Sequence, residues 1–163
     1  MKLKKVEIRN FKNFKGHQTI DLDVSKKKNV VLVHADNGFG KTAFLESILF
    51  CFYGIDSGGK NVIYEQLMNN EARANGETHL EVIIDFVNDD NVPHRLIRML
   101  FNNDKTTLKL IKDIDGDSKN IENVENTINE ILPKSMAPYF FFGGETTKKF
   151  LDKRGNKEIE KAV

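Results

Sequence analysis

The sequence predicts an α/β fold in which a mixed sheet carries an antiparallel meander. Two observations lead to this prediction. An unbroken apolar run at residues 29–33 is followed by a glycine-rich loop at 35–42 and then by a helical pattern. Between residues 80 and 114, three segments with alternating apolar residues are separated only by short turns. A chain of 163 residues has the size of one ordinary domain.

The first two strands are expected to pair as a hairpin. Apolar residues alternate with polar ones in residues 4–11 and again in 17–22, and Gly16 is placed in the turn between them. The segment 29–33, Asn-Val-Val-Leu-Val, is apolar at its last four successive positions, which is typical of a strand covered on both faces. We therefore expect this strand at the centre of the sheet.

A helix is predicted directly after the glycine-rich loop. It is expected to end at Gly54, where a residue in the left-handed conformation would cap it. Apolar residues recur along one side of this helix at helical spacing. They are Phe44, Leu45, Ile48, Leu49 and Phe52.

The remaining elements follow from spacing and from turn residues. Residues 62–76 predict a second helix, and residues 121–132 predict a third helix that Pro133 stops. The aromatic run 139–142 is expected mainly to fill the core, and the polar tail 146–163 is expected to be helical. The three strands of the meander are placed at 80–86, 95–101 and 106–114.

Composition narrows the classes of function. Charged residues make up 30% of the chain, and no apolar run approaches the roughly 20 residues of a membrane span. The N-terminus lacks the apolar segment of a signal peptide, which favours a cytoplasmic protein without a membrane partner. The single cysteine, Cys51, lies among apolar residues and is expected to be a buried, inert thiol.

Basic residues are concentrated at the N-terminus. Residues 1–28 carry nine Lys and Arg against three acidic residues, whereas acidic residues are in excess in the remainder. A basic edge of this kind suits DNA phosphates, although solvated lysines explain such clusters more often. The candidate DNA contacts are Lys2, Lys4, Lys5, Lys26, Lys27 and Lys28.

The glycine-rich loop matches the phosphate-binding pattern G-x-x-x-x-G-K-[ST] at every fixed position except the first. Ala35 stands at the opening position, and Gly40, Lys41 and Thr42 stand at the end. In such a loop, backbone N–H groups surround the phosphates, the lysine reaches the β and γ oxygens, and the hydroxyl binds Mg²⁺. Alanine tolerates any backbone conformation with a negative φ, so the loop is still predicted to bind a nucleotide.

Three motifs resemble the ABC-type ATPase heads of the SMC-like class, which includes RecF and SbcC. IRNFKNFKG, residues 8–16, is similar to the opening strand of that class, and residues 35–54 are similar to its phosphate loop and helix. YFFFGGE, residues 139–145, stands at the place of its Q-loop, and this aromatic run most resembles the DndD ATPases of DNA phosphorothioation systems. The resemblance spans residues 1–163 and identifies them as the N-terminal lobe of such a P-loop NTPase head.

The resemblance implies a site for ATP and Mg²⁺. Lys12 and Asn13 match residues that reach the phosphates in this class, but an ordinary surface turn explains their sequence equally well. The Q-loop maps to Gly143, Gly144 and Glu145, where Gly143 replaces the glutamine of the class. The implied nucleotide-binding residues, with Thr42 as the metal ligand, are Lys12, Asn13, Asn37, Gly38, Phe39, Gly40, Lys41, Thr42 and Ala43.

The resemblance also implies that the chain is one half of a split head. In this class, a coiled coil and a C-terminal lobe with the signature motif and the Walker B carboxylates follow, and neither motif occurs in this sequence. No catalytic residue is therefore assigned, and the chain alone is expected to bind nucleotide poorly and to hydrolyse it negligibly. The implied partners are its own C-terminal lobe, a second head in a homodimer, DNA and other proteins of the same system.

The leading functional prediction is an ATPase whose ATP-dependent head dimerisation acts on DNA in phosphorothioate modification, restriction or phage defence. A break-repair or recombination ATPase of the SbcC or RecF type is the alternative within the class. A non-hydrolysing, nucleotide-gated scaffold is a second alternative, which the missing glutamine favours slightly. A self-contained P-loop kinase or GTPase is disfavoured, because its strands should alternate with helices.

Overall fold

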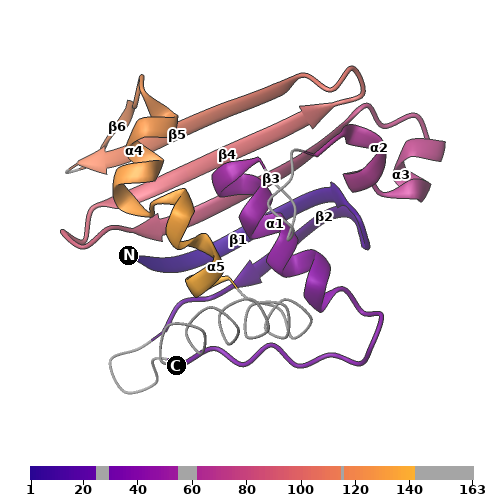
Figure 1. Ribbon diagram of the computed structural model, residues 1–163, viewed down its shortest axis with the longest axis horizontal. Coiled ribbons are helices and arrows are strands. Elements are labelled where there is room, and N and C mark those ends of the chain that lie inside the picture. The colour runs from indigo at the N-terminus through magenta and orange to yellow at the C-terminus, as the bar shows by residue number, and fades with distance from the viewer. Residues whose placement is uncertain (25–29, 55–61, 115, 142–163) are drawn as a thin grey trace, which may run out of the picture.

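The computed structural model describes residues 1–24, 30–54, 62–114 and 116–141. In this part of the chain, six strands form one antiparallel sheet, and helices pack across one of its faces (Figure 1). The α/β fold class predicted from the sequence is therefore confirmed. In spatial order, the strands are β2 (Phe14–Asp21), β1 (Lys2–Phe11), β3 (His79–Val87), β4 (Pro93–Phe101), β5 (Thr106–Ile114) and β6 (Asp117–Asn120).

The N-terminal hairpin forms as predicted, but its turn lies elsewhere. β1 and β2 pair antiparallel, with Val6 opposite Ile20, and the chain reverses at Lys12 and Asn13. Gly16, expected in the turn, lies inside β2 with a φ of 67°, where the register between the two strands shifts. Glycine suits this position because a β-bulge often places its extra residue in the left-handed conformation.

The predicted meander is confirmed. β3, β4 and β5 pair antiparallel in sequence order, with Ile84 opposite Leu96 and Leu96 opposite Leu110. Every second side chain of β3 and β4 is buried, as expected when one face of a sheet is covered. A further strand, β6, extends the meander and was not predicted, because its sequence Asp-Ser-Lys-Asn has no apolar alternation.

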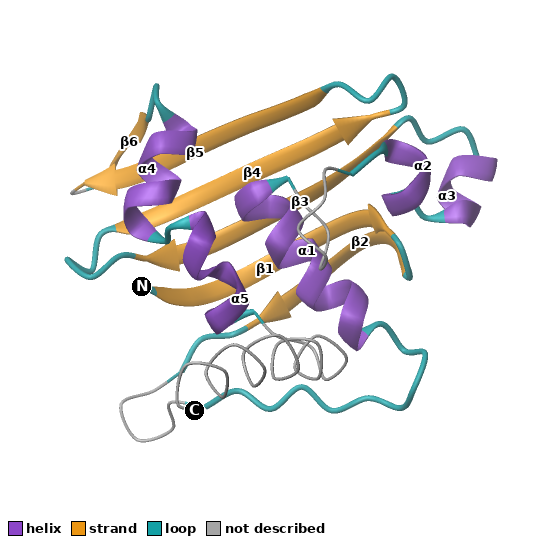
Figure 2. Ribbon diagram, in the orientation of Figure 1, coloured by secondary structure: helices purple, strands orange, loops and turns teal. Residues whose placement is uncertain are grey.

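The strand predicted at 29–33 does not form in the described residues. Residues 30–36 have no regular secondary structure, and Val30 and Leu32 keep 79% and 87% of their surface exposed. Figure 2 shows this segment as a loop that runs outside the sheet. The described sheet is therefore antiparallel throughout and not mixed. The prediction was wrong because a strand buried on both faces needs a neighbouring strand on each side, and the described strands supply none.

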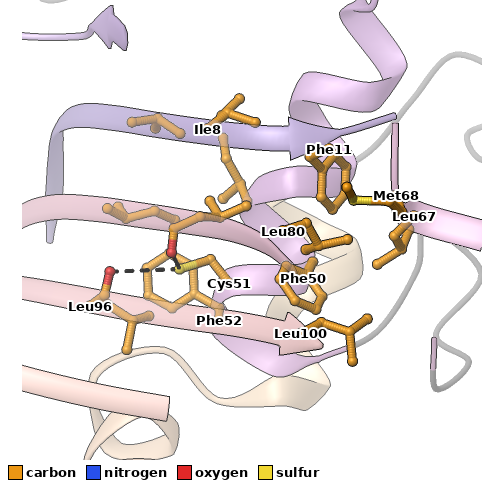
Figure 3. Close-up of a cluster of buried hydrophobic side chains, with 14 of the residues drawn as sticks. Ile8, Phe11, Phe50, Cys51, Phe52, Leu67, Met68, Leu80, Leu96 and Leu100 are labelled. Atoms are coloured by element: carbon orange, nitrogen blue, oxygen red, sulfur yellow. Dashed lines mark hydrogen bonds between the residues drawn. The ribbon is translucent and has the colours of Figure 1, made fainter. Parts of the chain in front are cut away.

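Helix α1 (Lys41–Tyr53) packs across the sheet and forms the core with it (Figure 3). Residues 50–52 are its most buried hydrophobic positions: the Phe50 ring contacts Phe11 of β1, and the Phe52 ring contacts Phe86 of β3. Phe44 and Leu45 of the predicted stripe are only half-buried, since the deepest burial lies in the second half of the helix. The helix ends at Gly54 in the left-handed conformation, as predicted.

The single cysteine is buried, as predicted. Cys51 Sγ lies 3.3 Å from the carbonyl oxygen of Val82 on β3 and donates a weak hydrogen bond to it (Figure 3). Burial raises the pKa of the Cys51 thiol to about 12. The thiol is therefore neutral at physiological pH, which makes it a poor nucleophile.

The helix predicted at 62–76 is divided in two. α2 (Tyr64–Leu67) ends at Met68, whose backbone is extended, and α3 (Asn70–Ala74) begins after Asn69. The Asn69 side chain accepts hydrogen bonds from the N–H groups of residues 71 and 72, so it caps α3 and competes with a continuous helix. Figure 1 shows both short helices beside the end of the β1–β2 hairpin.

The described chain ends in a second group of helices on the covered face of the sheet. α4 (Val124–Ile131) confirms the helix predicted before Pro133 and contacts β5. A 3-10 turn, η1 (Lys134–Met136), leads into α5 (Ala137–Phe140). The aromatic run divides there: Phe141 packs on Phe52 with ring centroids 6.3 Å apart, whereas Phe140 is largely exposed.

Some predictions concern residues outside the described part of the chain. Residues 142–163 include the Q-loop region Gly143, Gly144 and Glu145 and the tail predicted to be helical. Residues 25–29 include Lys26, Lys27 and Lys28. Within the four described segments, no helix is long and apolar enough to cross a membrane.

Candidate nucleotide-binding site

Two glycines shape the loop that leads into α1. Gly38 and Gly40 have φ angles of 86° and 92°, a left-handed conformation that other residues rarely adopt. Phe39 N donates a hydrogen bond to Asp36 O at 3.3 Å, which closes a turn between the two glycines and the preceding chain. Ala35 is not among the described residues with a positive φ, so alanine fits at the position where the pattern opens with glycine.

Helix α1 starts from this loop with its N-terminal donors open. Gly40 is the N-cap and provides no side-chain hydrogen bond, and the first turn contains no acidic residue. The first N–H groups of a helix have no partner within the helix, and the helix dipole places partial positive charge at this end. The start of α1 is therefore suited to bind an anion such as a phosphate.

The first two residues of α1 have the side chains that phosphate and Mg²⁺ require. Lys41 Nζ donates to Ala35 O at 2.5 Å and to Asp36 O at 2.8 Å, so the ammonium group folds back over the loop. Thr42 is exposed, which leaves its hydroxyl accessible to a metal ion. Both side chains thus lie at the helix end that favours negative charge.

The β1–β2 turn meets the loop from the other side. Asn13 Nδ2 donates to Gly38 O at 3.1 Å, and Lys12 Nζ lies 2.5 Å from Glu46 Oε2 on α1. A Cβ atom added at Gly40 would lie 3.4 Å from the Phe14 ring, which shows how closely β2 approaches the loop. Two segments that are far apart in the sequence thereby form one site.

The loop, the turn and the helix start line an open cavity of about 410 Å³. This volume lies within the range of about 300–1,000 Å³ that is typical of ligand pockets. Of the nucleotide-binding residues predicted from the sequence, only Phe39 does not line the cavity, and 73% of its surface is exposed. The lining residues are Lys12, Asn13, Asn37, Gly38, Gly40, Lys41, Thr42, Ala43 and Glu46.

Glu46 belongs to the cavity but was not predicted. It is buried and pairs with Lys12, so it holds a cation at the edge of the site. A signal existed in the sequence, because Glu46 follows Thr42 by four positions and residues at that spacing share one side of a helix. The pairing with Lys12, however, depends on the contact between the hairpin and α1, which no local pattern predicts.

The chemistry of the cavity fits the phosphate chain of a nucleotide. It offers two lysine cations, an asparagine amide, open backbone N–H groups and a hydroxyl, which are groups that bind phosphate oxygens. The carboxylate of Glu46 is the exception, and Lys12 pairs with it. The Thr42 hydroxyl is the group that would hold Mg²⁺ beside the phosphates.

The lysines proposed from the sequence as DNA contacts are partly engaged within the protein. Lys4 Nζ pairs with Asp23 at 2.6 Å, and Lys5 Nζ pairs with Glu7 at 2.8 Å and with Asp85 at 3.2 Å. Hydrogen bonds to Glu7 and Asp85 raise the pKa of Lys5. Lys2 is exposed on β1. The pairs of Lys4 and Lys5 would compete with phosphate contacts, so these two residues are weaker candidates than the sequence suggested.

Comparison with known proteins agrees with this fold. The DNA double-strand break repair Rad50 ATPase of Methanocaldococcus jannaschii is 28% identical over 121 residues, which are 74% of this chain and 11% of the relative. A solved structure of the recombination mediator protein RecF with ATP covers 93% of this chain and 37% of the RecF chain, with a TM-score of 0.54 and 19% identity. A second RecF structure, RecF-ATPrS, covers 92% and 37%, with a TM-score of 0.55 and 20% identity.

A family model provides the assignment of the chain. The model described as an AAA domain matches residues 5–163, which include β1 from Lys5 onward, every later described element and the whole phosphate loop. The RecF structures add the fold, and the Rad50 relative adds a second match in sequence. The chain therefore belongs to the AAA domain family, and its fold is similar to that of the RecF structures.

Proposed function

We propose that this chain is the ATP-binding lobe of an SMC-like ATPase that acts on DNA in repair or recombination. The observation that carries the proposal is the convergence of Lys12, Asn13, Lys41 and the open start of α1 on one cavity of about 410 Å³, a size typical of ligand pockets. The names of its relatives support the process, since Rad50 is a break-repair ATPase and RecF is a recombination mediator. The narrower prediction, phosphorothioate modification or phage defence, rests mainly on the aromatic run, and neither the name of the Rad50 relative nor the titles of the RecF structures refer to either process.

The roles of the residues follow from their chemistry. Backbone N–H groups at the start of α1 would bind the phosphates, Lys41 would neutralise charge at the β and γ oxygens, and Lys12 and Asn13 would contact the chain from the hairpin. Mg²⁺, when bound at Thr42, supplies positive charge to the same oxygens. None of these residues can activate the attacking water, so hydrolysis would depend on groups from the proposed C-terminal lobe and a second head.

The exposed run Val30–Val33 supports a covering partner. All four side chains are exposed, although their sequence is typical of a strand covered on both faces. An apolar surface of this kind beside a ligand site usually marks an interaction surface. We propose that the C-terminal lobe of the same protein covers it, which agrees with the chain spanning only 11% of Rad50 and 37% of RecF.

Nucleotide binding by the complete protein tests the proposal directly. Lys41→Ala removes the cation at the loop, and we expect the affinity for a fluorescent ATP analogue with Mg²⁺ to fall by about 100-fold or more, since at least two charge-assisted hydrogen bonds are lost. Lys15→Ala is the matched control, because Lys15 is an exposed hairpin lysine that pairs with Glu71 outside the cavity. Unchanged affinity in Lys41→Ala would refute the nucleotide site.

The scaffold alternative predicts binding without turnover. The observation that favours it is Gly143, which lacks the side chain of the glutamine usual at that position in the class. Phosphate release by the complete protein, measured with and without DNA, distinguishes the two functions. Turnover that disappears in Lys41→Ala supports the ATPase, whereas tight ATP binding with no turnover above that variant supports the scaffold.

A further inference from the structure

The turn that presents Lys12 and Asn13 to the cavity has an unfavourable backbone. Asn10 and Lys12 have φ angles of 54° and 47°, the left-handed region that residues other than glycine rarely occupy. Asn10 is compensated locally, because its Oδ1 accepts a hydrogen bond from Gly16 N at 2.9 Å. Such conformations persist only where the surrounding structure enforces them, and they cluster at functional sites.

The enforcing contacts come from the junction between α2 and α3. Asn69 N donates to Asn10 O at 2.8 Å, and Asn69 Nδ2 donates to Lys12 O at 2.6 Å. Lys12 N in turn donates to Leu67 O at 2.6 Å. Both backbone groups of Lys12 are therefore held by the same junction, whose residues Leu67 and Asn69 do not line the cavity.

The Asn69 side chain can hold the turn and cap α3 together, because its amide both accepts and donates hydrogen bonds. Its Oδ1 accepts from Glu71 N at 3.1 Å and from Ala72 N at 3.0 Å, which caps α3, while its Nδ2 holds the hairpin. The residue is nearly buried, with 9% of its surface exposed, so no water replaces these bonds easily. Only a side chain with both an acceptor and a donor satisfies the two elements at once.

We propose that Asn69 is a positioning residue for the nucleotide site. It does not line the cavity, but it fixes the strained turn and thereby places Lys12 Nζ and Asn13 Nδ2 at the phosphates. Without this bond the turn relaxes toward ordinary backbone angles, and both side chains leave the positions from which they bind. The inference rests on the proposed nucleotide function and adds a residue outside the phosphate motif.

Asn69→Asp isolates the bond to the hairpin. Aspartate caps a helix as well as asparagine does, so α3 keeps its cap, but it cannot donate to Lys12 O. In the complete protein we expect the affinity for ATP with Mg²⁺ to fall about tenfold, the factor expected when one ionic contact to phosphate is lost. Asn123→Asp is the matched control, since Asn123 precedes α4 and makes no side-chain cap. That variant should bind as the wild type does.

A double-mutant cycle separates positioning from general stability. If Asn69 acts through the turn, Asn69→Asp should have less than about a twofold effect on affinity in a Lys12→Ala, Asn13→Ala background. The same tenfold loss in that background, or an unchanged affinity of Asn69→Asp in the wild type, would overturn the proposal.

A second substitution, Asn69→Ser, tests the proposal if Asn69→Asp does not fold. Asn69→Ser keeps a shorter cap but cannot reach the hairpin, and a folded Asn69→Ser protein should repeat the loss of affinity. Failure of both Asn69 variants to fold would mark the residue as one required for folding and would also overturn the proposal.

The result for Lys41→Ala keeps the two proposals apart. Unchanged binding in Lys41→Ala removes the nucleotide function itself. Lost binding in Lys41→Ala together with unchanged binding in Asn69→Asp removes only the role of Asn69.

Discussion

Replacing Arg98 with methionine is expected to destabilise the helix that carries the phosphate loop. Arg98 lies on β4 with 6% of its surface exposed, and its guanidinium reaches the C-terminal end of α1. Nε donates to Cys51 O at 2.9 Å, and Nη2 donates to Phe52 O at 3.2 Å. A cation at this end of a helix also interacts favourably with the helix dipole. Arg98 therefore joins the meander to α1 through two charge-assisted bonds.

The magnitude follows from what methionine leaves behind. The two carbonyls at the end of α1 lose their donors in a buried place, which costs about 1–3 kcal/mol for each group. Part of this cost is offset, because burying the guanidinium is itself unfavourable, and this burial lowers the pKa of Arg98. Methionine fills most of the space, so a cavity adds little. We expect a net loss of about 2–4 kcal/mol, or roughly 5–12 °C in Tm for a chain of this length.

Urea denaturation followed by circular dichroism measures this loss. Arg73→Met is the control, because Arg73 is an exposed residue of α3, and its replacement should change the free energy of unfolding by less than about 0.5 kcal/mol. An Arg98→Met protein as stable as the wild type would refute the reasoning. It would mean that the cost of burying the cation equals the whole value of its bonds to α1.

Two further predictions concern α1 and its loop. The Cys51 thiol, with its pKa raised to about 12 by burial, should resist iodoacetamide at pH 8 in the native protein and react once urea unfolds it, as mass spectrometry would show. Stoichiometric labelling of native protein would contradict this burial. Gly40→Ala should cost about 1–2 kcal/mol in backbone strain and weaken ATP binding, because its φ is 92° and the new Cβ would lie 3.4 Å from Phe14. Gly116→Ala, at a φ of 87° in a distant turn, is the control and should cost similar stability while leaving ATP binding unchanged. If the Gly40→Ala and Gly116→Ala proteins bind ATP with equal affinity, the role of the loop geometry in binding is refuted.

The sequence predicted correctly those strands whose pattern of apolar residues is local. In β3, every second residue is apolar, which predicts a strand with one covered face, and α1 covers that face. These apolar residues are Leu80, Val82, Ile84 and Phe86. The division of the helix at 62–76 was missed because the deciding contact is tertiary. The Asn69 side chain caps α3 and donates a hydrogen bond to Lys12 O, and the helix is interrupted at this residue. Lys12 lies 57 positions away in the sequence, so no local pattern shows this contact.

The candidate site was likewise predicted most completely where its residues are contiguous in the sequence. The phosphate motif is contiguous, so the sequence alone predicts Gly38, Gly40, Lys41 and Thr42, and the structure lines one cavity with them. Glu46 and Asn69 belong to no motif, and their contacts with the hairpin are seen only in the structure. Lys12 and Asn13, for which a plain surface turn was an equal explanation, are brought to the cavity by that hairpin, which favours their role at the phosphates.

The exposure of Val30–Val33 indicates what kind of surface the proposed C-terminal lobe must supply. An alternating strand such as β3 is satisfied by cover on one face, which α1 provides (Figure 2). A run that is apolar at successive positions directs side chains to both faces, so it needs cover on two sides and strand neighbours for its backbone. A lobe that docked only a helix there would bury half of the run. We therefore expect the proposed lobe to pair strands with this segment. Because Ala35 follows Val33 by two positions, the same pairing would fix the start of the phosphate loop.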